Sequence, residues 1–571
     1  MLAELVKRYE SRTAEGKIPR QGWSKAKISF GLRLKESGEI AELIDLRTEK
    51  QSGKKSVLVA QEIEVPEQVK KSSGIVSNFL CENAKYFFGI EENIKRFEEA
   101  KRLHLEILEN CNSVAAVAVK NFFTNWKPSE IEKFSQIQEY LEDLEKGANI
   151  LLMFGENYVS EDAEIKMAWE NYKQNQSESP LMPCLVTGKI LPTARLHPII
   201  KGVRNAQSAG ASIVSFNAPA FESYGRTGEQ GLNAPVSEYA AFAYGAALND
   251  LLSDSEHVKY FGDATVVYWA DENSTECQDC FLGLLEPKED EISNKDLNEI
   301  MKGIQAKNLV FEGKKLNYEN PFYILGLSPN SARLSIRFFL EKNFGEVVEN
   351  IAKHYRDLKI TKPSFKKFEN IPLWQILAAT VSPKSKDKAS SPLMSGAVIK
   401  SIMTGQNYPV SLFQNAILRV KTEHEITYER AAIIKAYLTR NKGRENLMAL
   451  DENSTDKNYI FGRIFSVLEN IQEAANPGLN ATIKDKYFNS ACATPAHIFP
   501  ILQKLSVNHL RKLEIGQKIY FEKQLTNLMG KISPTEKKSS TLTLEEQGMF
   551  ILGYYHQTQE RYKSKEEKEN G

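Results

Sequence analysis

The chain has 571 residues, in which 74 lysines and arginines are balanced by 74 aspartates and glutamates. This length and a hydrophobic content of 42% are typical of a protein with two to four domains and a substantial core. No run of about twenty apolar residues occurs, which excludes a transmembrane helix, and six cysteines are too few for a disulfide scaffold. Because the N-terminal segment is charged throughout, unlike a signal peptide, we expect a cytoplasmic location.

The first 68 residues predict a small antiparallel β-rich module that follows a short helix, Leu2–Tyr9. Apolar and polar residues alternate along Trp23–Leu34 and along Ile40–Leu46, which predicts two strands joined by a turn at residues 37–38. A third strand is expected within residues 54–66, KKSVLVAQEIEVP.

A largely helical stretch comes next. Apolar residues recur at spacings of three and four from Asn93 to Glu145, and we expect further helices to about Lys173 and then a loop over residues 174–179. Just before this stretch, Lys70 and Lys71 stand beside serines and a glycine, which suits a phosphate contact. The alternative is a solvated turn that leads into a buried helix.

The central region, from Cys184 to Asp250, is dense in glycine and polar residues. Glycine reaches backbone conformations that are closed to other residues, so this composition favours structured loops that offer backbone N–H groups to a ligand. Regular elements are expected around these loops: strands over Cys184–Gly188, Ala211–Phe216 and Asp263–Ala270, a helix over Glu238–Leu252 capped by Ser237, and a strand pair over Asn320–Leu340 that turns at residues 328–330.

Helical periodicity dominates after Trp374. Helices are expected over Leu412–Val420, Tyr428–Leu438, Tyr459–Ala474, Ile498–Leu513 and Glu545–Gln559. From Pro372 to the end, about 27 basic residues stand against about 20 acidic ones, which suits either a nucleic-acid-facing surface or an ordinary solvated surface. The predicted fold class is α+β, with an N-terminal β-rich and helical region (1–180), an α/β body with Gly/Asn-rich loops (181–371) and a C-terminal helical bundle (372–571).

No common catalytic motif is found in the sequence. It contains no G-x-x-x-x-G-K-[ST] phosphate loop, no G-x-G-x-x-G after a strand and no H-E-x-x-H. Cys277 and Cys280 form a C-x-x-C that we expect in an acidic loop, Asp271–Asp279, without a metal, because a zinc site needs four ligands. Cys81 and Cys184, which have apolar neighbours, are expected to be buried. We predict no metal, no cofactor and no enzymatic activity; a metal-dependent nuclease acting on DNA or RNA is the alternative.

Two sets of polar residues in the central region are candidates for contacts with nucleic acid. A backbone phosphate suits the basic set, Arg195, His197, Lys201 and Arg204. Base edges suit the amide and hydroxyl set, Asn217, Ser223, Tyr224, Gln230 and Asn233. The alternatives are a structural His-Pro turn for the first set, and helix caps and turn bridges for the second.

Long strings in this order resemble the large subunit of the type I-C CRISPR surveillance complex, Cascade, of the Csd family. They include SGIVSNFLCENAKYFFG, CLVTGKILPTARLHPIIKGV, SFNAPAFESYG, GLNAPVSEYAAFAYGAALNDLL, FYILGLSPNSARLSIRFF and GMFILGYYHQTQ. The resemblance spans nearly the whole chain. One departure is the insertion of Arg226, Thr227 and Gly228, which lengthens the loop between SYG and EQG.

The resemblance implies a non-catalytic subunit for antiviral defence that contacts the 5′ region of the CRISPR RNA. Such a subunit recognises the protospacer-adjacent motif in target double-stranded DNA and aids R-loop formation. Its implied partners are the backbone and 5′-end Cascade subunits and a helicase-nuclease recruited after target binding, with no membrane. Lys70, Lys71 and Asn78 then join the amide and hydroxyl set on the duplex-DNA face. A scaffold that binds no nucleic acid is a further alternative.

In this family the C-terminal portion can also be made as a separate small subunit, and Met394, Met403 and Met448 are possible internal starts. We predict that residues 448–571 fold alone, which circular dichroism and thermal melting of the expressed fragment would check. The fragment is expected to bind single-stranded DNA weakly through its cations and aromatic rings. These residues are Lys484, Lys486, Tyr487, Arg511, Lys512, Lys518 and Tyr520. The alternative is an ordinary solvated basic face.

Overall fold

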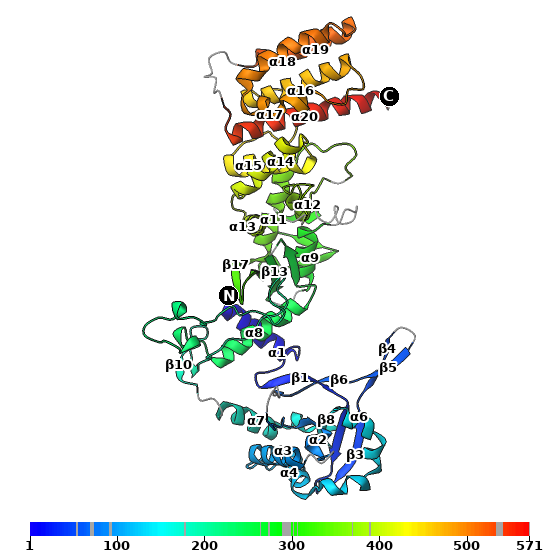
Figure 1. Ribbon diagram of the computed structural model, residues 1–571, viewed down its shortest axis with the longest axis vertical. Coiled ribbons are helices and arrows are strands. Elements are labelled where there is room, and N and C mark those ends of the chain that lie inside the picture. Colours follow the sequence, from blue (N-terminus) through cyan, green and yellow to red (C-terminus); the bar gives the residue numbers. More distant parts are fainter. Residues whose placement is uncertain are drawn as a thin grey trace. The chain divides into compact units, whose positions relative to one another are not determined.

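The computed structural model has an α+β fold, as predicted (Figure 1). It divides into two compact units. The first unit comprises residues 1–200 and 214–250, and the second comprises residues 201–213 and 251–571. Within the described residues, no helix combines the length and apolar character that a membrane crossing needs. The structure describes residues 1–52, 55–68, 74–90, 94–175, 179–262, 264–271, 275–287, 299–300, 302–304, 307–367, 369–386, 390–532 and 541–569.

A mixed sheet with the strand order β3-β2-β8-β7 lies at the centre of the first unit. Strand β2 (Phe30–Leu34) pairs antiparallel with β3 (Ile40–Asp45) but parallel with β8 (Asn149–Phe154). The antiparallel pairing predicted within residues 1–68 is confirmed, but the prediction of helices from Asn93 to Lys173 is wrong at β8. This strand is a short, continuous apolar run, and periodicity cannot separate such a run from a buried helix.

The predicted strand Trp23–Leu34 forms, but it divides at Ser29 into β1 (Trp23–Ile28) and β2, which belong to different sheets. β1 pairs with β6 (Gln61–Pro66), and β4 (Thr48–Ser52) pairs with β5 (Lys55–Val59). The expected third strand over residues 54–66 is thus two strands separated at Ala60.

Helices cover the mixed sheet and bury an aromatic core with it. Phe79, Phe87, Phe122 and Phe123 are all at most 1% exposed in this core. The remaining elements of this part are α1 (Leu2–Ala14), β7 (Cys81–Asn83), α2 (Ala84–Phe87), α3 (Ile94–Ile107), α4 (Val114–Asn125), α5 (Ser135–Glu139), α6 (Leu141–Glu145), β9 (Asn157–Tyr158) and α7 (Ala163–Asn175).

A completely buried histidine, His104, fixes the segment that enters β7. Its Nδ1 lies 2.7 Å from the carbonyl oxygen of Ala100, and its Nε2 lies 2.9 Å from the backbone nitrogen of Leu80. Nε2 must accept the Leu80 N–H, so Nδ1 carries the proton and donates to Ala100. Burial lowers the pKa of His104 to about 3.

This histidine predicts a loss of stability in mild acid. Between pH 6.5 and pH 3, His104 is protonated in the unfolded chain but not in the folded chain. The free energy of unfolding therefore falls by about 1.4 kcal/mol for each pH unit of acidification. Above pH 6.5 the effect is absent. The free energy of unfolding, measured with urea at several pH values, should therefore fall less per pH unit for His104→Gln than for the wild type. The exposed His497 provides the control, and identical slopes for the wild type and His104→Gln would contradict the prediction.

The loop-rich segment of the first unit begins with a hairpin, β10 (Leu181–Pro183) and β11 (Ile190–Pro192). The predicted strand Cys184–Gly188 is wrong, because these residues form the turn between them. The Sγ of Cys184 accepts N–H groups from Ser237 at 3.2 Å and Thr187 at 3.4 Å. Burial opposes ionisation, but these bonds lower the pKa of Cys184 to about 7. The thiol is buried, as predicted, and also holds the turn.

The predicted strand Ala211–Phe216 is also wrong. Ser212 makes only an isolated bridge to Arg333, and the residues after it are irregular. The apolar run is too short, and too rich in small neighbours, for pattern alone to show whether a partner strand pairs with it. The predicted helix is confirmed as α8 (Glu238–Ser253), and the Ser237 hydroxyl accepts the Ala240 N–H at 3.2 Å, as expected for a cap.

An antiparallel sheet with the order β12-β13-β16-β17 opens the second unit. The predicted strands are confirmed, but the turn falls at residues 331–332 instead of 328–330, where Ser331 has a φ of +54°. One face of the sheet packs against α9 and α11. The elements are β12 (Val258–Phe261), β13 (Ala264–Ala270), α9 (Thr275–Leu285), β14 (Leu309–Phe311), β15 (Lys314–Leu316), β16 (Pro321–Asn330), β17 (Arg333–Asn343) and α11 (Phe344–Leu358).

The C-x-x-C pair lies on α9 and not in the acidic loop that we predicted. Cys277 and Cys280 are both completely buried, one turn apart, on the face of α9 that joins the core. Their side chains pack with Phe281 and Phe322. Three-residue spacing on a helix places two small residues on the same face, which explains the motif by packing alone.

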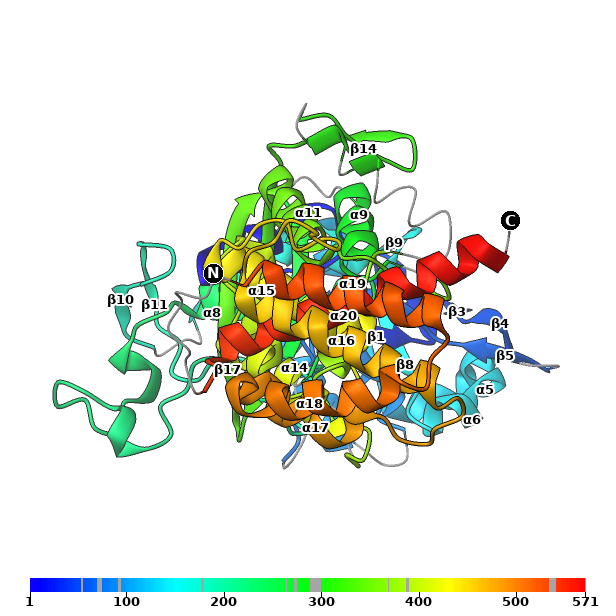
Figure 2. The ribbon, with the colours of Figure 1, turned by 90° about the horizontal axis from the view of Figure 1, so that it is seen from above.

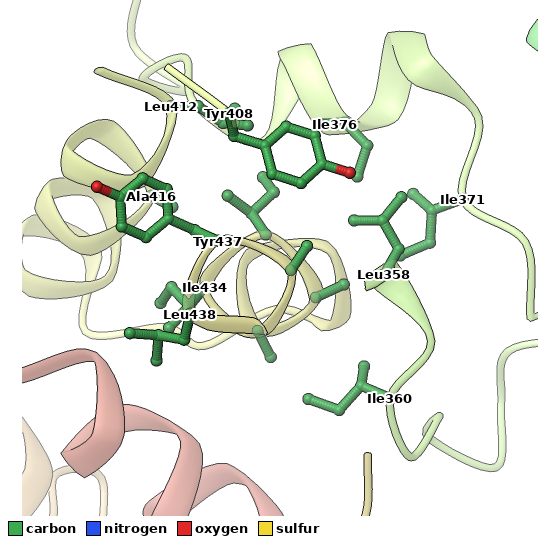
Figure 3. Packing of buried hydrophobic residues seen from close by; sticks show 14 of the residues in the cluster. Leu358, Ile360, Ile371, Ile376, Tyr408, Leu412, Ala416, Ile434, Tyr437 and Leu438 are labelled. Atoms are coloured by element: carbon green, nitrogen blue, oxygen red, sulfur yellow. The ribbon is translucent and has the colours of Figure 1, made fainter. Parts of the chain in front are cut away.

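Helices complete the second unit, and the five predicted ones are confirmed. The sequence did not predict α12, α13, α17 and α19. Figure 3 shows α15 surrounded by Leu358, Ile371, Ile376 and Tyr408, and Figure 2 shows α16 and α20 side by side. The helices are α12 (Leu373–Ala378), α13 (Pro392–Thr404), α14 (Val410–Glu423), α15 (Tyr428–Lys442), α16 (Lys457–Ala475), α17 (Ile483–Ala493), α18 (Pro495–Leu510), α19 (Ile515–Gly530) and α20 (Leu544–Glu569).

One continuous buried cluster runs from the sheet of this unit through α20. Helix α20 packs against α14 and α15 as well as against α16. A fragment that begins at Met448 would expose the side of α20 that α14 and α15 cover. The independent folding of residues 448–571 stays a prediction. Exposure of this side of α20 would lower the stability of the fragment.

Candidate nucleic-acid interface

The candidate site is the loop over residues 217–233, between β11 and α8, which we call the central loop. Two short 3-10 helices, Pro219–Phe221 and Gln230–Asn233, lie near its ends. Gly231 joins the loop to the segment that follows β11: its N–H donates to the Arg195 carbonyl at 3.0 Å. A Cβ at Gly231 would lie 2.3 Å from the Ala194 carbonyl oxygen, so only glycine fits this close approach.

Asn233 closes the central loop from within. Its Nδ2 donates to the carbonyls of Arg226 at 3.1 Å and Gln230 at 3.0 Å, and its Oδ1 accepts the Ser223 N–H at 2.9 Å. The whole amide is therefore occupied inside the loop. These bonds fit the alternative of a turn bridge, and a base contact by Asn233 stays a prediction.

Arg226 and Glu222 tighten the same loop. Arg226 donates from Nη1 to the Leu232 carbonyl at 2.9 Å, and Glu222 Oε1 accepts the Gly228 N–H at 3.0 Å. Arg226 also pairs with Glu229 at 3.7 Å. No sequence pattern indicates these two roles, because each depends on a backbone group brought close only by the folded loop. The insertion that lengthens the loop thus supplies a residue that holds it closed.

The outward side of the central loop carries Tyr224, whose side chain is 99% exposed. Its φ of +56° is unusual for a residue with a side chain, so the loop holds Tyr224 in a strained conformation. Gly225 and Gly228 also have positive φ, and a Cβ at either would meet nothing within 4 Å. Asn217 and Ser223 are exposed as well. The hydrogen-bonded loop thus displays the ring of Tyr224 beside glycines whose backbone is not crowded by other atoms.

Arg195 and Gln230 form a pair that links the two predicted sets. Arg195 Nε donates to Gln230 Oε1 at 3.1 Å, and Gln230 has a φ of +50°. Arg195 is exposed, so the amide orients a guanidinium that faces solvent. Guanidinium groups held in this way suit phosphate oxygens.

His197 lies beside this pair but turns inward. Its Nδ1 lies 2.8 Å from the hydroxyl of the buried Tyr244, and the two rings stack with centroids 6.0 Å apart. Burial lowers the pKa of His197, so the imidazole is neutral near pH 7 and offers no charge to a phosphate. This environment corresponds to the structural alternative for His197.

The other residues of the basic set, Lys201 and Arg204, belong to the second unit. Both are exposed. The Arg204 N–H donates to Thr265 Oγ1 at 3.0 Å, and its guanidinium lies 5.8 Å from the Tyr260 ring centroid. The four basic residues therefore divide two and two between the units.

Of the three residues expected to join from the N-terminal region, only Asn78 is described. Lys70 and Lys71 lie outside the described residues. Asn78 is 8% exposed, and its backbone N–H and Nδ2 donate to Glu82 Oε1 at 3.1 and 3.0 Å. A buried amide bonded to a buried carboxylate serves the structure of this turn.

The C-terminal set lies on α17 and α19 and on the segment after α18. Lys484 and Lys486 extend over the rings of Tyr554 and Tyr487, each with Nζ 5.2 Å from the centroid. Lys512 donates to Asn476 Oδ1 at 2.8 Å, and Lys518 faces Glu522 at 3.9 Å. Arg511 is exposed, and Tyr520 is 56% exposed. The set is accessible, but several of its cations already have partners.

Among the described residues, no group of three or more His, Cys, Asp and Glu side chains could hold a metal ion. A family model described as CRISPR-associated protein (Cas_Csd1) matches residues 5–562. No curated protein matches the chain.

Proposed function

Since the chain belongs to the family of CRISPR-associated Cas_Csd1 proteins, the large subunits of Cascade complexes, we propose that it serves in a type I-C complex and recognises the protospacer-adjacent motif in duplex DNA. It then aids R-loop formation and contacts the 5′ region of the CRISPR RNA, whose pairing with the target reads the sequence. The C-terminal helices lie along the displaced strand, and a separate helicase-nuclease cuts the target. We propose no catalytic role for the chain itself.

The observation that supports duplex recognition best is the internal closure of the central loop. Asn233, Arg226 and Glu222 use their polar atoms to fix its shape, while Tyr224 is left 99% exposed. A loop ordered before binding loses little entropy when it enters a groove. An exposed ring at its tip can wedge against a base step, as side chains of minor-groove proteins do, and the open glycines allow close approach to the sugar edge.

Two substitutions separate base reading from phosphate contact in the reconstituted complex. Tyr224→Ala should reduce the preference for duplexes with the correct motif, by on the order of 1–3 kcal/mol. Arg195→Ala should weaken all duplexes alike and reduce the salt slope by about one, because one phosphate contact is lost. Equilibrium binding to duplexes with and without the motif, at several salt concentrations, measures both effects.

Thr227→Ala is the matched control, because Thr227 is exposed in the same loop. Asn233→Ala should also lower motif preference, but through loop order, and amide exchange over residues 223–230 should quicken in this variant alone. If Tyr224→Ala and Arg195→Ala both bind like Thr227→Ala, the central loop is not the duplex-reading element.

A further inference from the structure

The segment over residues 359–375, which we call the strap, follows α11 and includes the first residues of α12. Among its described residues, 359–367 and 369–375, it displays two aromatic side chains. Phe365 is 80% exposed and Trp374 is 57% exposed. The other four tryptophans of the chain are at most 9% exposed. Exposed apolar surface marks an interaction site where it is contiguous, whereas singly scattered rings are common on soluble proteins.

The strap is anchored firmly to the second unit. Ile360, Ile371, Leu373 and Ile376 are at most 4% exposed, and Figure 3 shows Ile360, Ile371 and Ile376 around α15. The hydroxyl of Tyr428 donates to the Glu369 carbonyl at 2.8 Å. The exposure of the two rings therefore results from how the strap is held and not from a loose chain.

Basic side chains accompany the rings. The strap contains four lysines, Lys359, Lys362, Lys366 and Lys367, and one acidic residue, Glu369. Lys362 donates from Nζ to the carbonyls of Lys366 at 2.5 Å and Lys367 at 3.3 Å, which fixes the turn that carries Phe365. Lys366 pairs with Glu429 at 2.8 Å, and Lys359 pairs with Glu369 at 3.0 Å. Lys367 is exposed beside Phe365.

Two shallow hollows adjoin the rings. Phe365, Lys366, Lys367 and Asn370 line a hollow of about 250 Å³. Trp374 lines another of about 220 Å³, together with Thr427 and Glu429. Gln375 lines both, so the two hollows meet at this one side chain.

We propose that the strap is a binding site for single-stranded nucleic acid, in which bases stack on Phe365 and Trp374 and Lys367 holds a phosphate. Aromatic rings accept any base, and lysines between them follow the backbone, so the site would be tolerant of sequence. The strap has four lysines and one acidic residue, and this net positive charge favours a polyanion over an uncharged apolar peptide. The site lies in the second unit and takes a single strand, so it is independent of duplex recognition by the central loop.

The single exposed tryptophan makes a local optical test possible with the full chain. Adding a 20-nucleotide oligothymidylate at low salt should quench the tryptophan emission, since a base that stacks on Trp374 quenches its fluorescence. The quenching should disappear in Trp374→Phe. In the same titration followed by anisotropy, Phe365→Ala and Trp374→Ala should each weaken binding by about tenfold. An oligouridylate arm distinguishes displaced DNA from guide RNA as the preferred strand.

Leu393→Ala removes a side chain that is 70% exposed on another helix of the same unit and provides the matched control. Oligonucleotide binding without quenching, or binding by both aromatic variants equal to that of Leu393→Ala, would overturn the proposal. The proposal would also be overturned if iodide failed to quench the fluorescence of Trp374 in an assembled complex from which the nucleic acid has been removed. Another protein subunit would then cover the strap.

Discussion

Gly462→Ala is expected to lower the free energy of unfolding of the second unit by about 3 kcal/mol. Helices α16 and α20 cross at this residue so closely that a Cβ would lie 1.9 Å from the Phe550 carbonyl oxygen and 2.8 Å from the Tyr554 nitrogen. Gly553 on α20 meets the Tyr459 carbonyl of α16 at 2.0 Å in the same way. Both obstacles are backbone, so the two helices must separate to admit a methyl group.

Urea unfolding of the full chain measures this loss. Gly516 and Gly530 on α19 are suitable controls, because a Cβ at either meets nothing within 4 Å. Their replacement by alanine should leave stability unchanged or raise it by up to about 1 kcal/mol, since alanine favours a helix more than glycine does. A Gly462→Ala protein as stable as the wild type would show that the two helices do not cross at this glycine.

Asp357→Ala should be similarly damaging, because it leaves a buried cation without its partner. The Arg440 side chain is 1% exposed, and its Nε donates to Asp357 Oδ2 at 2.5 Å. The guanidinium also covers the ring of Tyr408 at 4.1 Å, and His354 bonds to the Tyr408 hydroxyl at 2.7 Å. Removing one member of a buried pair typically costs about 3–5 kcal/mol.

The double variant Asp357→Ala/Arg440→Met separates the pair from its surroundings. It should recover part of the loss, since it no longer buries an unpaired charge. Glu39→Ala breaks the exposed pair with Lys35 and should change the free energy of unfolding by less than about 1 kcal/mol. A thermal melt of each variant suffices. If Asp357→Ala is as mild as Glu39→Ala, Arg440 is not held in a buried pair.

Strong local patterns allowed much of the fold to be predicted. The helix Glu238–Ser253 carries its own cap at Ser237, and α16 has an apolar stripe along one face, so both were found nearly to their ends. Strand β8 was missed because its neighbours in the sheet lie far away in sequence. The turn Cys184–Gly188 was missed in part because one of its hydrogen bonds comes from residue 237, which no local pattern includes.

Composition pointed to the candidate site, but it did not show which residues hold the loop and which are exposed. Asn233 and Tyr224 are both suitable for DNA contact by residue type, yet one is occupied inside the loop and the other is exposed. His197 reads as a cation in the sequence, but burial lowers its pKa, and no local pattern shows that the fold packs it against the Tyr244 ring. The exposure of Phe365 and Trp374 also follows from the anchoring of the strap, which apolar periodicity does not reveal.

Photocrosslinking tests the central claim, that the central loop reads duplex DNA, most directly. A photoreactive phenylalanine derivative at Tyr224 is irradiated in the assembled complex bound to a target labelled on both strands. The same derivative at Tyr260, which is 47% exposed in the second unit, serves as the comparison. We predict crosslinks from position 224 at the base pairs of the protospacer-adjacent motif. Crosslinks from position 224 only outside the motif, or none while the complex stays bound to its target, would contradict the account.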